Sequence, residues 1–200
     1  MEVCFPIMEH FYTLQGEGYH AGRPAYFVRL GGCDVGCVWC DVKESWDASQ
    51  HNSMTIDEII DEIKKSKTDF VVITGGEPAM YDLTALVDLL HANNLEVAIE
   101  TSGCYPLKGG VDWYCFSPKK FKNPIDEAYQ KANELKVVIY NKTDFEWALE
   151  HALKVNALCK LYVQPEWSKS EALLPQIIDF VKLNPSWKLS LQTHKYLNIP

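Results

Sequence analysis

The chain has 200 residues, of which 47% are hydrophobic, and it carries a formal net charge of −8. This length and apolar content suit one domain over residues 1–200, and the negative charge argues against a nucleic-acid surface, which needs clustered Lys and Arg. No apolar stretch approaches the roughly 20 residues that cross a bilayer, and the N-terminal segment does not have the pattern of a signal peptide. Seven cysteines, an odd number, do not suit a secreted disulfide framework, so we expect a reducing cytoplasm.

Seven short apolar runs have the composition of β-strands. They are rich in Val, Ile, Tyr and Phe, and most are almost continuously apolar, which is typical of parallel strands covered on both faces. The runs are 25–30, 70–74, 96–100, 113–117, 136–140, 160–164 and 188–192. We therefore expect a parallel sheet.

Amphipathic helices are expected between several of these strands. Thr55 and Glu58 form a capping-box pattern ahead of a face of isoleucines. A second helix follows Asp82, a third begins at Thr143, and a fourth covers 170–183. Alternating strands and helices predict an α/β fold, although their spacing alone does not distinguish an open sheet from a partial barrel.

Polar motifs follow six of the seven predicted strands. In parallel α/β folds the carboxyl ends of the strands form one face, and that face holds the active site. The motifs are GGCDVGCVWC (31–40), TGGEP (74–78), ETSG (100–103), SPKK (117–120), QPE (164–166) and QTHK (192–195). We therefore expect these six segments to surround one site.

Three of the cysteines, Cys33, Cys37 and Cys40, stand in a C-x3-C-x2-C pattern. Thiolates at this spacing can converge on one soft metal centre, for which four cysteines are the usual number. With three, one metal corner stays open to a ligand that is not protein. A structural zinc ion is the alternative, with His51 or a distant cysteine as its fourth ligand. Burial as three small hydrophobic residues is the poorest interpretation, because the loop is rich in Gly and Asp.

This pattern, with Trp39 before its last cysteine, resembles the signature of radical S-adenosylmethionine (SAM) enzymes. In that superfamily three cysteines hold a [4Fe-4S] cluster, and its open iron binds the methionine part of SAM. A narrower resemblance, to the 7-carboxy-7-deazaguanine synthases, extends over nearly the whole chain. It rests on TLQGEG (13–18), FVRLGGCDVGCVWCD (27–41), VVITGGEP (71–78), IETSG (99–103), SPK (117–119) and LSLQTHKYLNIP (189–200).

The resemblance implies a reaction, a fold and an assembly. Members of this family are carbon–nitrogen lyases that convert 6-carboxy-5,6,7,8-tetrahydropterin to 7-carboxy-7-deazaguanine and ammonia by ring contraction, in queuosine and other 7-deazapurine biosynthesis. They share a shortened, parallel-strand partial (β/α) barrel of the radical SAM type and are homodimers. We therefore expect that fold, a small-molecule pterin substrate, an electron donor such as flavodoxin or ferredoxin, and no nucleic-acid or membrane partner.

The resemblance also assigns site residues, position by position. The cluster ligands are Cys33, Cys37 and Cys40. The residues expected to contact SAM are Trp39, Cys40, Asp41, Gly76, Glu77, Ser102, Ser117, Pro118, Lys119 and Gln164. The residues expected to contact the pterin are Leu14, Gln15, Gly16, Arg29, Thr74 and Pro200. No general acid or base is assigned, and the roles of Glu17, Glu100 and His194 stay open.

One position departs from the family pattern. In many relatives the residue two places after the last cysteine is a Thr whose hydroxyl helps to bind Mg²⁺, whereas here it is Val42. A hard cation needs oxygen ligands. Either substrate, water and backbone alone hold Mg²⁺, or another cation or none is used.

Two other functions remain as alternatives. A glycyl-radical-enzyme activase shares the cysteine spacing and the small size but acts on a partner protein, and it would leave the motifs at both ends of the chain unexplained. A non-catalytic zinc-binding module would be colourless and free of acid-labile sulfide, whereas an iron–sulfur protein purified without oxygen is brown.

Overall fold

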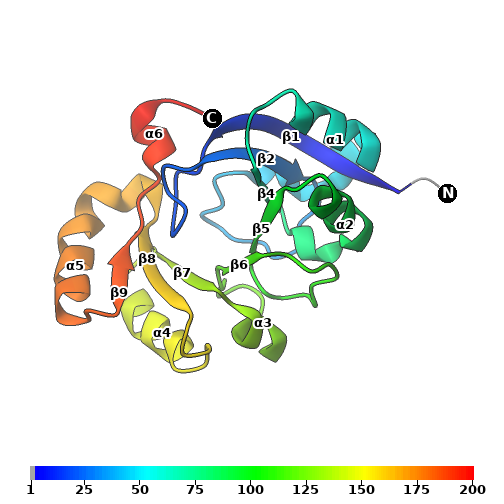
Figure 1. Cartoon of the computed structure of the whole chain (residues 1–200). Coiled ribbons are helices and arrows are strands. Elements are labelled where there is room, and N and C mark those ends of the chain that lie inside the picture. Colours follow the sequence, from blue (N-terminus) through cyan, green and yellow to red (C-terminus); the bar gives the residue numbers. More distant parts are fainter. Residues whose placement is uncertain (1–2) are drawn as a thin grey trace.

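The computed structural model describes residues 3–200, and its elements form one curved layer of strands with helices outside it (Figure 1). The strands are β1 (Cys4–Leu14), β2 (Pro24–Leu30), β3 (Ser53–Thr55), β4 (Phe70–Gly75), β5 (Glu96–Thr101), β6 (Trp113–Phe116), β7 (Glu134–Ile139), β8 (Lys160–Pro165) and β9 (Trp187–Leu189). The helices are α1 (Ile56–Lys64), α2 (Thr84–Ala92), α3 (Asp126–Lys131), α4 (Thr143–Ala152), α5 (Ser170–Leu183) and α6 (Thr193–Leu197). In this described range, no helix has the length and apolar character that a membrane span requires.

The strands form a single mixed sheet in the order β3-β1-β2-β4-β5-β6-β7-β8-β9. From β2 to β9 every neighbouring pair is parallel, whereas β1 is antiparallel to both β2 and β3. The edge strands β3 and β9 do not pair with each other, so the sheet curls without closing (Figure 1). The predicted partial (β/α) barrel is confirmed, with an antiparallel addition at one edge.

All seven predicted strands are present, with ends displaced by no more than three residues. Two strands were not predicted. β1 contains Pro6 and alternates between buried and exposed positions, so it has no continuous apolar run. β3 has only three residues. Two helices were also missed, because α3 and α6 have six and five residues, too few to show a helical period.

The predicted helices begin where their capping residues indicate. At α1 the Glu58 N–H donates to Thr55 Oγ1 (3.2 Å) and the Thr55 N–H donates to Glu58 Oε2 (2.8 Å), which completes the capping box. The Thr84 N–H donates to Asp82 Oδ1 (3.1 Å) at the start of α2. Helix α4 begins at Thr143 as predicted.

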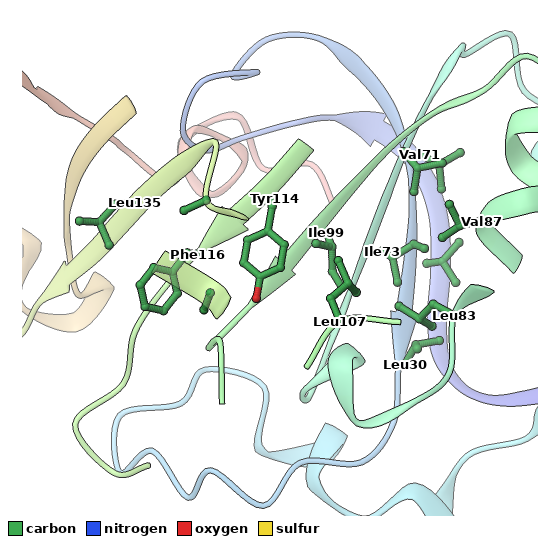
Figure 2. Close-up of a cluster of buried hydrophobic side chains, with 14 of the residues drawn as sticks. Leu30, Val71, Ile73, Leu83, Val87, Ile99, Leu107, Tyr114, Phe116 and Leu135 are labelled. Atoms are coloured by element: carbon green, nitrogen blue, oxygen red, sulfur yellow. The ribbon is translucent and has the colours of Figure 1, made fainter. Parts of the chain in front are cut away.

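The main hydrophobic core lies between the outer face of the sheet and the helices (Figure 2). Alternate residues of β4 and β5, such as Ile73 and Ile99, point toward Leu83 and Val87 at the start of α2, and all four are fully buried. Burying one such side chain stabilises the fold by about 1.5–3 kcal/mol. This layer fixes the positions of the strand ends.

The inner face of the sheet changes from apolar to polar along β2, β4 and β5. At the amino-terminal ends of these strands this face carries a separate apolar cluster of Ala25, Phe27, Phe70, Val72 and Ala98, with Phe11 and Trp113 packed against it. Side chains two residues apart in a strand share a face, so Arg29, Thr74 and Glu100 follow this cluster on the same side. The apolar cluster therefore forms the floor of a polar cavity.

Candidate active site

A cavity of about 260 Å³ inside the partial barrel is lined by residues from all six polar motifs. The three cysteines line it, as does every residue predicted to contact SAM or the pterin except Pro118. Pro118 is buried between Ser117 and Lys119, which both line the cavity. Glu17, Glu100 and His194 also line it. The six motifs therefore surround one cavity.

The cysteine loop after β2 depends on two glycines. Gly32 has φ +99° and Gly36 has φ +75°, a region that side-chain-bearing residues rarely adopt. The loop backbone is hydrogen-bonded to the turn at Lys43–Trp46, through Gly32 N–H to Ser45 O (2.6 Å) and Cys33 N–H to Trp46 O (3.1 Å). All three cysteine side chains consequently reach the cavity wall.

The cysteine thiols fit an iron–sulfur cluster better than a single zinc ion. Burial raises the pKa of Cys33, and raises that of Cys37 to about 11, so these thiols lose their protons only to a bound metal. No three His, Cys, Asp or Glu side chains between residues 3 and 200 converge on one ion position. His51, the alternative zinc ligand, instead hydrogen-bonds the backbone oxygen of Glu44 (2.9 Å). Separated thiols around one wall suit the separate corners of a cluster.

The segment that ends β4 lies directly against the cysteine loop. The Gly76 N–H donates to Leu30 O (3.0 Å), and the Glu77 N–H donates to Gly32 O (2.9 Å). A Cβ atom on Gly75 would lie 2.3 Å from Leu30 O, and one on Gly76 would lie 2.3 Å from Gly32 O. Two consecutive glycines are therefore required for this close approach.

The carboxylate of Glu77 is 1% exposed and saturated with hydrogen bonds. Its Oε1 accepts from the Ala79 N–H (3.1 Å) and the Thr101 hydroxyl (2.5 Å). Its Oε2 accepts from the N–H (2.8 Å) and the hydroxyl of Ser102. Three of these four bonds, those from Thr101 and Ser102, join the end of β4 to the end of β5, so the Glu77 side chain supports the cavity wall.

Lys119 provides the wall of the cavity with a cation that has no carboxylate partner in residues 3–200. Its Nζ lies 2.6 Å from Ser117 Oγ and 5.5 Å from the centroid of the Trp39 ring. The neighbouring Lys120 and Lys122, by contrast, each pair with an aspartate. Burial lowers the pKa of Lys119. A carboxylate ligand, such as that of a bound methionine group, fits this position.

The loop between β1 and β2 folds into the open side of the barrel. The Gly18 N–H donates to Ser190 Oγ (2.9 Å), and the Tyr19 N–H donates to Glu134 Oε2 (3.1 Å). Gly18 has φ +64°, and a Cβ there would lie 2.0 Å from Glu134 Oε1. The loop therefore bridges the β1–β2 hairpin, β7 and the segment after β9, and it presents Gln15 and Gly16 to the cavity.

Lys136, on the inner face of β7, is a cavity residue that sequence reasoning missed. Its Nζ lies 2.5 Å from Glu17 Oε2 and 3.4 Å from Glu100 Oε1. Burial alone would raise the pKa of Glu17, but the Lys136 ammonium outweighs it and holds the pKa at about 2. Burial would likewise lower the pKa of Lys136, but Glu100 and Glu17 raise it well above its usual value. Lys136 is a charged residue within a mostly apolar strand, two residues after Glu134 and so on the same face of the sheet. A charge at such a position is the sequence feature that points to it.

The segment after β9 closes the same side of the cavity. The His194 ring packs on Gly16, where a Cβ would lie 2.2 Å from its Nδ1. Asn198, with φ +53°, ends α6 and turns the chain back, so that Pro200 O accepts from the Thr13 hydroxyl (3.2 Å). Pro200 thus lies at the cavity, where the pterin contact was expected.

Arg29 serves both a salt bridge and the cavity. Its Nε donates to Glu9 Oε1 (2.7 Å), which is the strand-end ion pair that such a residue often makes. Its terminal guanidinium nitrogens have no partner among the described residues. Thr74, in register with Arg29 on the neighbouring strand, also lines the cavity. Together they offer hydrogen-bond donors to an anionic or carbonyl group.

The surroundings of Val42 do not fit Mg²⁺. Its own carbonyl accepts from the Ser45 N–H (3.1 Å) and the Ser45 hydroxyl (2.7 Å). The neighbouring Asp41 carboxylate is paired with Lys195 (2.8 Å). The Val42 carbonyl and Asp41 Oδ2 are therefore engaged, and Val42 has no side-chain oxygen to offer.

Three comparisons with known proteins agree with this geometry. The family described as the Radical SAM superfamily matches residues 27–156. A protein of Flavobacterium psychrophilum named 7-carboxy-7-deazaguanine synthase is 59% identical over 98% of this chain and 92% of its own, and the Synechocystis protein of that name is 47% identical over 100% and 95%. The crystal structure of QueE from Escherichia coli superposes with a TM-score of 0.84 at 32% identity, covering 94% of this chain and 93% of that one.

Proposed function

The chain belongs to the radical SAM superfamily and, within it, to the 7-carboxy-7-deazaguanine synthase family of queuosine biosynthesis, and we propose how its cavity performs that reaction. The protein is a lyase that converts 6-carboxy-5,6,7,8-tetrahydropterin to 7-carboxy-7-deazaguanine and ammonia. The observation that carries the proposal is that the cysteine loop, the Gly-Gly-Glu segment and the β1–β2 loop all face one cavity.

The superfamily implies a [4Fe-4S] cluster and SAM as cofactors. When bound, they supply the one-electron chemistry that removes a hydrogen atom from the substrate. We assign Cys33, Cys37 and Cys40 to the cluster. The Lys119 ammonium binds the SAM carboxylate. The Glu77 carboxylate already accepts four hydrogen bonds from the protein, so the segment Gly75–Glu77 contacts SAM through its backbone. The remaining SAM contacts are Trp39, Cys40, Asp41, Gly76, Ser102, Ser117, Pro118 and Gln164.

The chain's own contribution to the pterin is binding, orientation and exclusion of water. The free nitrogens of Arg29 form a fork that suits the substrate carboxylate or a ring carbonyl. Thr74, Leu14, Gln15 and Gly16 complete the wall, and the backbone oxygen of Pro200 accepts from the guanidine-like edge of the pterin. Phe11 and Phe27, which line the cavity from the apolar floor, keep water from the reacting ring.

The resemblance supports further proposals about assembly. Residues 1–200 form one radical SAM domain, two copies form a homodimer, and the protein works in the cytoplasm with flavodoxin or ferredoxin as electron donor. Light scattering on a sizing column tests the dimer. A mass of one chain, 22.8 kDa, would contradict it.

Magnesium has no side-chain ligand beside Val42. We propose that any cation bound there takes its oxygen ligands from substrate, water and backbone. Because position 42 supplies no side-chain oxygen, we expect the ion to contribute little to the rate, so a chelator should lower turnover by less than about twofold. Val42→Thr supplies the missing oxygen, and it should make turnover rise with added Mg²⁺.

The test of the reaction is turnover by anaerobically reconstituted protein given reductant, SAM and the free carboxytetrahydropterin. We expect wild-type protein to yield deazaguanine and one ammonia per product, and Cys37→Ala to yield neither. Turnover of a free pterin also separates this enzyme from an activase that acts on a partner protein. Wild-type rates in the Cys37→Ala variant would refute the proposal.

A further inference from the structure

A closed ring of polar contacts lies in the part of the cavity that we propose for the pterin. Lys136 Nζ pairs with Glu17 Oε2 (2.5 Å) and with Glu100 Oε1 (3.4 Å). The Gln15 Nε2 donates to the same Glu100 oxygen (3.1 Å), and the Glu17 N–H donates back to Gln15 Oε1 (3.0 Å). The ring thus joins the β1–β2 loop to β5 and β7, elements far apart in the sequence.

Lys136 is the one cation in this ring, and it is 3% exposed. In the described part of the chain no other Lys, Arg or His lies within ion-pair distance of Glu17 or Glu100. The second Glu17 oxygen accepts from Gln192 Nε2 (3.0 Å), an uncharged donor. Removing the ammonium would therefore leave two partly buried carboxylates facing each other without a counter-charge, and their repulsion would displace the loop.

The ring leaves one acceptor open to the cavity. Both Glu17 oxygens and Glu100 Oε1 have partners, whereas Glu100 Oε2 has none among the described residues. A carboxylate fixed on one oxygen and free on the other is placed to accept from an N–H group of a bound ligand.

We propose that Lys136 is a positioning residue for the pterin. It acts through Glu17 and Glu100, holding Gln15 and Gly16 in place and keeping the free Glu100 oxygen directed into the cavity. This inference rests on the proposed function, because it assigns the pterin to this side of the cavity. It does not concern the cluster ligands. The ring is joined to the SAM side of the cavity through Gln192, which donates to both Glu17 Oε1 (3.0 Å) and Asp41 Oδ2 (3.4 Å).

The first test is steady-state kinetics of reconstituted Lys136→Met, with Lys131→Met as a matched surface control. We expect the KM for the pterin to rise at least about tenfold, because Gln15, Gly16 and Glu100 lose their fixed positions. The KM for SAM should rise less than the KM for the pterin, and the iron content should stay within about twofold, because neither Lys119 nor the cysteines contact the ring. Lys136→Arg keeps the charge and should recover most of the affinity. A lower kcat with unchanged pterin KM, or no recovery by arginine, would overturn the proposal.

Amide hydrogen exchange provides a readout that does not depend on turnover. In Lys136→Met the amides of residues 15–19 should exchange roughly tenfold faster than in wild type, while the segment Gly75–Glu77 keeps its protection. Unchanged exchange at 15–19 would overturn the positioning role. Should wild-type protein fail to convert the pterin, the proposed function falls, and exchange still decides whether Lys136 orders this loop.

A double variant covers the case in which Lys136→Met does not fold. Glu17→Gln together with Lys136→Met removes the repulsion along with the ion pair, so it should fold while the ring stays broken. The raised pterin KM and the fast exchange at 15–19 should persist in it. A double variant with the wild-type KM would show that the ring has no positioning role.

Discussion

Two carboxylates of the cavity wall, the buried Glu77 and the partly buried Glu17, are stabilised in different ways. Glu77 accepts four hydrogen bonds from neutral donors, all within 25 residues of it in the sequence. Glu17 pairs with an ammonium group 119 residues away. The wall near the cysteines is thus built from local motifs on adjacent strands, whereas the wall near the β1–β2 loop depends on long-range contacts, of which the Glu17–Lys136 ion pair is the charged one.

The difference predicts that the two walls fail independently. Damage to the hydrogen-bonded wall should impair SAM and leave the pterin KM intact. Damage to the ion-paired wall should raise the pterin KM more than the KM for SAM. The stability that this wall provides should depend on pH. The predictions below test this comparison.

The largest effect is expected for Glu77→Gln. The amide NH₂ group must face donors at one of the two former oxygen positions, so two buried donors lose their acceptor. We expect the free energy of unfolding to fall by about 2–4 kcal/mol. The KM for SAM should rise at least about tenfold, while the pterin KM changes by less than about twofold. Denaturant unfolding and kinetics measure these quantities, and an equal rise in both KM values would show that the two walls are coupled.

A smaller effect, confined to acid, is expected for Glu17. Its pKa is lowered to about 2 from the ordinary value of 4.5, so its ion pair stabilises the fold fully above pH 4.5. That contribution, about 3 kcal/mol at most, disappears as the pH falls from 4.5 toward 2. Unfolding measured across this range should show a steeper loss of stability in wild type than in Glu17→Gln. Parallel curves would mean that Glu17 is not ionised in the folded protein.

The smallest effect is expected at the rim of the cavity. Lys195 pairs with Asp41 (2.8 Å), but the Asp41 side chain is 54% exposed. Lys195→Ala should therefore cost less than about 1 kcal/mol, and the difference should vanish in high salt. A larger, salt-independent loss would place this pair with Glu17 and Lys136 as part of the cavity wall.

The same contrast explains which features the sequence revealed. The cysteine loop and the Gly-Gly-Glu-Pro segment are contiguous motifs, and their glycines are required by contacts between neighbouring strand ends, so both could be predicted. The parallel strands were found because they are covered on both faces. β1 was missed because one of its faces is partly exposed, and its register depends on pairing with β2 rather than on local composition.

Lys136 shows why the wall near the β1–β2 loop was not predicted from the sequence. The predicted strand began at this residue, where a lysine resembles an exposed strand end, whereas β7 begins two residues earlier and places it inside the barrel. Its partners Glu17 and Glu100 lie in different segments, and only the curvature of the sheet brings them together. The KM tests at this residue are therefore tests of tertiary arrangement rather than of a motif.

The β1–β2 loop has a consequence for biogenesis. Its partners Ser190 and Thr193 are made about 170 residues later, so a ribosome-bound chain holds this loop without its anchors for most of translation. The parallel strand–helix units between them can pack as they emerge. The cysteine-bearing wall can therefore form on a nascent chain that has no pterin pocket, and synthesis of the segment after β9 determines when that pocket can be completed.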